Sequence, residues 1–260
     1  MVFLSKLKHD QGRESAQQNW GILFPLILLI THEIFTVILL EFPTFLVYLT
    51  KVSPFFEERL TKISPKYILR VGNELVITIV NISIIIIIRY ILRIRYDTSF
   101  NQMGLSFCNF RKYLFYGGTI GIIKSTVIII PILMIWPEYT ESYKRIDILQ
   151  GASVLQGVSL FFGYFLGMII AGPLCEEILF RGLFFSALRK YVNLFWAILI
   201  SACLFSFTHG FFPVMISAFL SAILLCFLYE KTRSLMLCIT IHAVGNVFNN
   251  LYFILFSFII

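Results

Sequence analysis

Charged residues are scarce in this sequence. Only 13% of its 260 residues are Asp, Glu, Lys or Arg, whereas 58% are hydrophobic. Soluble domains carry about 25% charged residues, because their water-facing surface needs them. The composition therefore excludes a soluble globular domain. It predicts an all-α, polytopic membrane helix bundle in which about seven helices, within a range of about six to eight, cross the lipid bilayer.

Other features are also missing. The five cysteines follow no metal or disulfide spacing, and we interpret them as packing residues. An HExxH zinc motif, an internal repeat and a low-complexity linker are absent, so we expect one integral membrane domain over residues 1–260. The polar residues 1–19 predict that no signal peptide is cleaved. We interpret the net charge of +7 through the positive-inside rule, and we expect no nucleic-acid partner.

Apolar runs bounded by charge predict seven membrane segments. The first and fourth are longer than the roughly 20 residues that a span needs. His32 and Glu33 favour a turn between two half-helices in the first, and Gly172-Pro173 favours a hinge in the fourth. Basic loops favour an N-terminus inside the cell, although the basic residues 51–70 oppose it unless the first segment is a hairpin. The segments are about 20–48, 71–94, 113–136, 152–188, 192–209, 211–229 and 234–259.

Ionisable residues inside the fourth segment point to a function, because an ionised side chain there costs at least about 2.5–3.5 kcal/mol. Glu177 and Arg181 share a helix face at a spacing of four residues, so they can pair. Glu176 lies about 100° around the helix and is left free. One paired and one unpaired carboxylate suit separate structural and catalytic roles. A salt bridge that only ties helices together is the alternative for Glu177 and Arg181.

Two further polar groups lie in later segments. His209 ends the fifth, with Phe205 one turn earlier, and His242 and Asn246 share a face of the last. Taken separately, such residues often cap a helix or join membrane helices. Counted at about 1.5 Å per residue from the connecting turns, however, these groups reach the depth of Glu176 near the middle of the membrane.

A carboxylate, two imidazoles and a carboxamide that converge in a dry cavity form a hydrolytic set. The carboxylate suits a general base, and histidine and asparagine can donate to an oxyanion. Glu176, His209 and His242 could instead bind zinc as a His₂Glu set. Lys124 in the third segment is interpreted as a side chain that snorkels or pairs with a carboxylate.

The three motifs occur in a recognisable order. Glu-Glu-x-x-x-Arg at 176–181, Phe-x-x-x-His at 205–209 and His-x-x-x-Asn at 242–246 resemble the type II CAAX prenyl endopeptidase family. That family is also called CPBP or Abi, for CAAX proteases and bacteriocin-processing enzymes. The resemblance covers about residues 150–250, which would form a CPBP-like catalytic core. The first 110 residues carry little of it.

The resemblance implies an intramembrane endopeptidase. Glu176 would activate the attacking water with help from His209, while His242 and Asn246 would stabilise the oxyanion. Arg181 would hold its acidic partner and the helix in place. Family members are often labelled metalloproteases, but we expect no obligatory cofactor and keep zinc as the alternative.

The predicted function is hydrolysis of peptide bonds in membrane-associated proteins or peptides. The alternative is a non-catalytic membrane protein that binds a regulatory partner, such as a sensor kinase or secretion factor, or acts in bacteriocin immunity. A proton-coupled transporter is a third interpretation, which the lack of paired broken helices disfavours. The Ile-, Phe- and Lys-rich sequence indicates a low-GC bacterium. We therefore expect a multi-pass protein of the bacterial plasma membrane, without prenylated CAAX substrates.

Overall fold

The computed structural model describes residues 20–52, 65–137, 162–210 and 212–259, and these ranges contain helices and no strand. The fourth predicted segment is a continuous rod of four labelled pieces. The elements are α2 (Leu23–Val52), α4 (Pro65–Tyr96), η1 (Phe100–Met103), α5 (Phe110–Ile135), η4 (Phe165–Ala171), α8 (Gly172–Glu177), η5 (Ile178–Phe185), α9 (Ser186–Leu188), α10 (Leu194–Phe207), α11 (Phe212–Thr232) and α12 (Leu235–Ile259).

Six of the described helices are long and apolar enough to cross a membrane, and α10 is a shorter apolar helix of 14 residues. Large apolar side chains such as Phe35, Ile79 and Phe115 are exposed on the outside of the bundle, where lipid tails would cover them. The predicted all-α bundle of about seven helices is therefore confirmed. The six spans are Leu23–Leu49, Val71–Tyr96, Phe110–Ile135, Phe162–Leu188, Phe212–Thr232 and Leu235–Phe256.

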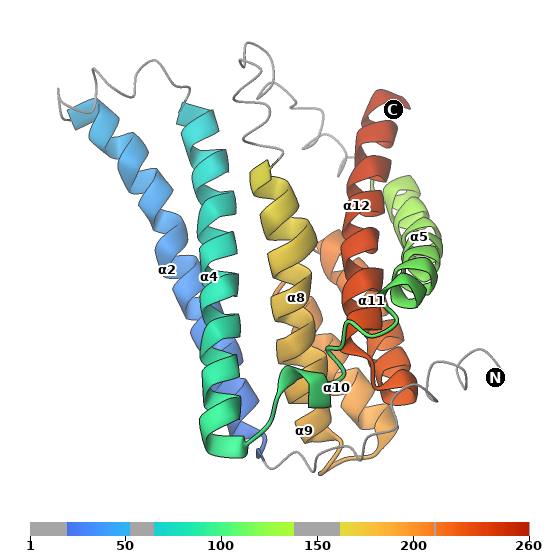
Figure 1. Cartoon of the computed structure of the whole chain (residues 1–260). Helices are drawn as coiled ribbons and strands as arrows, with labels where there is room; N and C mark the ends of the chain where they lie inside the picture. Colours follow the sequence, from blue (N-terminus) through green and yellow to red (C-terminus); the bar gives the residue numbers. More distant parts are fainter. Residues whose placement is uncertain (1–19, 53–64, 138–161, 211, 260) are drawn as a thin grey trace.

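The helices are arranged around the rod that contains α8 (Figure 1). Helices α2 and α4 pack together at one edge, and α12 packs along α5 at the other. Glycine allows the second pair to approach closely: a β-carbon at Gly121 would lie 2.9 Å from the carbonyl oxygen of Ile241. Every residue from Ile178 to Leu188 is buried, so this rod is the centre of the described bundle.

The first segment differs from expectation. Helix α2 continues without a break through His32 and Glu33, so the predicted turn and the hairpin alternative are wrong. His32 finds polar partners inside the bundle: its Nδ1 lies 3.0 Å from Glu33 Oε1, and its Nε2 lies 3.0 Å from Asn81 Oδ1 on α4. Because these contacts replace water, the polar residues do not need to leave the helix.

The fourth segment does not break at Gly172-Pro173, because the chain stays helical from Phe162 to Leu188. The helix changes type instead: α8 lies between two π-helical segments, η4 and η5. A π turn shifts the backbone hydrogen bond from the fourth to the fifth residue. This shift can accommodate Pro173, which has no N–H to donate. Residues 152–161 of the predicted segment lie outside the described residues.

Candidate active site

The four predicted site residues line one cavity of about 190 Å³, which is room for several water molecules. Glu176 comes from α8, His209 follows α10, and His242 and Asn246 come from α12. The residues therefore meet at one cavity in the helix bundle, as the depth estimate predicted. Their chemical roles remain predictions.

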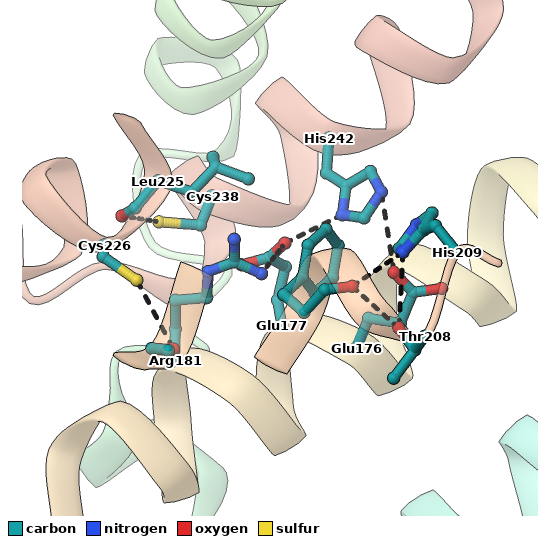
Figure 2. A network of polar contacts seen from close by, with 11 residues as sticks. Glu176, Glu177, Arg181, Thr208, His209, Leu225, Cys226, Cys238 and His242 are labelled. Carbon is teal, nitrogen blue, oxygen red and sulfur yellow. Dashed lines mark hydrogen bonds and ion pairs between the residues drawn. The ribbon is translucent and has the colours of Figure 1, made fainter. Parts of the chain in front are cut away.

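Glu177 and Arg181 form a buried ion pair beside the cavity. Arg181 Nη1 donates to Glu177 Oε1 at 3.0 Å, and both side chains are fully buried. Glu177 Oε1 is also 2.8 Å from His242 Nδ1 (Figure 2). The carboxylate thus connects α8 to η5 and to α12, and it fixes the orientation of the His242 ring.

The two carboxylates have different surroundings. Glu177 is completely enclosed, whereas the Glu176 side chain is 28% exposed and lines the cavity. Glu176 Oε2 is 3.8 Å from His242 Nε2, too long for a direct hydrogen bond. Glu176 Oε2 has no hydrogen-bond partner among the described residues. One carboxylate therefore organises the site, and the other is free to bind water.

His209 lies two residues after the end of α10, in the short 208–210 loop. Its Nδ1 donates to the carbonyl oxygen of Phe205 at 2.8 Å. Gly210 follows with a φ of 62°, a left-handed conformation that glycine adopts without strain. In the neutral ring Nε2 then carries the lone pair and can accept a proton.

Phe205 explains the Phe-x-x-x-His spacing. Its ring is 2% exposed and packs 4.6 Å from the His209 ring and 5.9 Å from the His242 ring, measured between centroids. The guanidinium carbon of Arg181 lies 4.6 Å from the same ring centroid. Phe205 therefore separates the buried ion pair from the cavity and holds both histidines in position.

The orientation of the Asn246 side chain depends on the π-helical segment η4. Its Nδ2 donates to the carbonyl oxygen of Met168, within η4, at 2.9 Å. A π segment can present a carbonyl in this way because its backbone hydrogen bonds are rearranged. One amide hydrogen is occupied by this contact, and the second remains for a ligand in the cavity.

Sequence reasoning did not assign Asn81 or Lys124 to the site, yet both line the same cavity. Each is a polar residue in an apolar span, which is a signal visible in the sequence. The sequence does not show which way these two side chains point, because that depends on how α4 and α5 are rotated against their neighbours. His32, by contrast, reaches the site only through Asn81.

The zinc alternative requires Glu176, His209 and His242 to converge on one ion. Within the described ranges, no group of three His, Cys, Asp or Glu side chains lies close enough to hold a metal. The Nδ1 atoms of His242 and His209 are engaged by Glu177 and by a carbonyl, an arrangement that leaves each Nε2 as the atom that could bind a metal. As arranged, the three side chains do not converge on one ion, and the expectation of no obligatory metal stays a prediction.

The fold and the site together define a polytopic membrane protein with a partly open cavity, into which a carboxylate, two imidazoles and a carboxamide face. Residues 158–248 match the family described as type II CAAX prenyl endopeptidase Rce1-like. Over this region the chain is similar to that family, as the order of the three motifs predicted. The match contains every residue of those motifs.

A curated relative is the protein of Bacillus subtilis (strain 168) named "Putative membrane peptidase YdiL". It is 34% identical over 79 residues, which cover 30% of this chain and 32% of the relative. The similarity therefore spans about a third of each protein. No solved structure matches the chain.

Proposed function

We propose that this protein is an intramembrane endopeptidase that hydrolyses peptide bonds of membrane-associated proteins or peptides. The observation that carries the proposal is the convergence of Glu176, His209, His242 and Asn246 on one cavity between membrane-spanning helices. The match of residues 158–248 to a peptidase family supports it. The relative from Bacillus supports a location in a bacterial plasma membrane.

The attack on the peptide bond begins at Glu176. Its free carboxylate oxygen takes a proton from water, and the hydroxide oxygen bonds to the carbonyl carbon. The Nε2 lone pair of His209 accepts the water's other hydrogen as a hydrogen bond and so orients the water. The result is a tetrahedral intermediate whose former carbonyl oxygen carries the negative charge.

The oxyanion is held from α12. Asn246 donates its second amide hydrogen, and His242 donates from Nε2 when both ring nitrogens carry protons. Glu177 supplies the counter-charge at His242 Nδ1, 2.8 Å away. The intermediate collapses when the C–N bond breaks and Glu176 returns its proton to the leaving nitrogen. The products are a carboxylic acid and an amine, which exchange one proton to become a carboxylate and an ammonium.

This mechanism uses no obligatory metal. It needs Glu176 as an unligated base, whereas a zinc mechanism would use the same residues as ligands. Substitution of these residues cannot separate the two mechanisms, because both need them. Metal content and chelation can.

The test uses Glu176→Gln, which keeps the shape of the side chain and removes the base. The protein is reconstituted in phosphatidylethanolamine–phosphatidylglycerol vesicles with a library of fluorescence-quenched peptides. We expect the wild type to cleave a subset of peptides and Glu176→Gln to be at least about 10²-fold slower. The matched control is Glu41→Gln on an exposed face of α2, which should cleave at the wild-type rate.

Substrates in cells can be found with the same variant. Crosslinking and purification of Glu176→Gln should retain membrane proteins that the wild type releases as cleaved fragments. If the wild type cleaves nothing, or if Glu176→Gln supports the cellular function fully, the endopeptidase proposal is wrong. A non-catalytic membrane partner would then be the better explanation.

A further inference from the structure

Lys124, in the third span, has no role in the hydrolytic mechanism described above for Glu176, His209, His242 and Asn246. Lys124 lies in α5, is 6% exposed, and lines the cavity that contains Glu176. It is about 21 Å from the start of α5 and about 17 Å from its end, at 1.5 Å per residue. A lysine side chain cannot span either distance, so the predicted snorkelling does not explain it.

Lys124 makes no hydrogen bond and no ion pair shorter than 4.0 Å with any residue in the described part of the chain. The carboxylates of the site have other neighbours: Glu177 is bound by Arg181 and His242. An ammonium buried in a membrane span is costly unless a partner or a function requires it. The predicted pairing with a carboxylate is therefore not a direct contact.

The position of the ammonium is well defined. Lys124 Nζ touches Gly245 on α12, and a β-carbon at that glycine would clash with Nζ and would lie 2.9 Å from Lys124 Cε. The neighbouring Ser125 donates to the Gly245 carbonyl oxygen at 3.1 Å, and this hydrogen bond joins α5 to α12 next to Lys124. Gly245 lies three residues after His242 and directly before Asn246.

The ammonium thus lies beside the part of α12 that carries both proposed oxyanion donors. We propose that Lys124 is a further catalytic residue whose ammonium binds the oxyanion of the tetrahedral intermediate, together with His242 and Asn246. This inference rests on the proposed function. No bond to lysine forms or breaks: the ammonium keeps its protons and stabilises the charge that develops on the carbonyl oxygen.

The same placement explains the small residue at position 245. A methyl group there would push the ammonium away, and only the flexible end of Lys124 would have to move, because the next nearest atom, Ser125 Oγ, is at 3.5 Å. Gly245→Ala should therefore displace the charge while the helices stay packed.

The test compares Lys124→Met with Lys112→Met, the same chemical change at an exposed position on the same helix. In the vesicle assay we expect Lys124→Met to lower kcat about 10²-fold, the scale of one lost oxyanion donor, with KM within about twofold. Lys112→Met should match the wild type. Gly245→Ala should also lower kcat, but it should have no further effect when Lys124 is already methionine.

A binding measurement separates catalysis from structure. The probe is a phosphinate analogue of the best-cleaved peptide, whose anionic oxygen occupies the place of the oxyanion. Lys124→Met should weaken phosphinate binding by the same factor as kcat. The parent peptide, measured in the Glu176→Gln background, should bind as before.

The outcomes are distinct. If Lys124→Met keeps kcat within about threefold, or loses kcat while phosphinate affinity is unchanged, the role of Lys124 is overturned and the endopeptidase function stands. If Gly245→Ala lowers kcat by the same factor in the wild type and in Lys124→Met, the contact on which the inference rests is overturned. If the wild type cleaves no peptide, the proposed function fails and this inference fails with it.

Discussion

Replacing Arg181 with methionine tests how much the buried ion pair contributes to stability. Arg181 and Glu177 are both fully buried and are joined by one 3.0 Å hydrogen bond. Removing one member of such a pair leaves an uncompensated buried charge, which typically costs about 3–5 kcal/mol. Glu177 would keep its contact with His242 at 2.8 Å, so we expect a loss near the lower limit, about 3 kcal/mol.

A loss of this size is measurable in detergent. For a chain of this length, each kcal/mol lowers Tm by about 2–4 °C, so Arg181→Met should lower it by about 6–12 °C. The matched control is Arg189→Met, because Arg189 pairs with Glu230 at 3.3 Å but is 27% exposed. Loss of that partly exposed pair should cost at most about 1 kcal/mol.

A double substitution checks the cause. Glu177→Gln together with Arg181→Met removes both charges, so stability should recover by more than half, although His242 would lose its counter-charge and activity would stay low. If Arg181→Met unfolds at the same temperature as the wild type, or if the double variant is less stable than Arg181→Met, the charge-pair reasoning is wrong.

Three further predictions follow from the site and the packing. His209→Ala should lower kcat by at least about 10²-fold while Tm stays within the error of the wild type; a matching loss of Tm would make His209 structural. Gly121→Leu should separate α5 from α12, since even a β-carbon would lie 2.9 Å from the Ile241 carbonyl oxygen. Its Tm should fall further than that of Gly118→Leu, where no atom lies within 4 Å of a β-carbon. Elemental analysis should find well under one zinc per chain, and activity should survive a small chelator such as phenanthroline; stoichiometric zinc, with activity lost on its removal and restored on re-addition, would reverse this expectation.

The sequence could predict which polar residues meet at the cavity because its signals are local. A spacing of four residues on a helix fixes which side chains share a face, so the Glu177–Arg181 pair and the shared face of His242 and Asn246 could be predicted. Charge in an apolar run is costly, so the sequence alone marks Glu176 as an exceptional residue.

The remaining features depend on contacts between distant helices. His32 and Asn81 are 49 residues apart, and only their meeting explains why α2 does not turn at His32. The position of the Lys124 ammonium depends on the close approach of α5 to Gly245. The π segments around Pro173 are a backbone adjustment that side-chain periodicity does not encode. The single-domain organisation and the membrane orientation remain predictions.

The central claim is that the cavity adds water to a peptide bond through Glu176. The most direct measurement is cleavage of the peptide library in ¹⁸O-labelled water, with the new carboxyl termini identified by mass spectrometry. The account predicts new termini carrying one ¹⁸O atom in the wild type and at least about 10²-fold fewer with Glu176→Gln. Termini without the label, or equal labelling in both proteins, would contradict it.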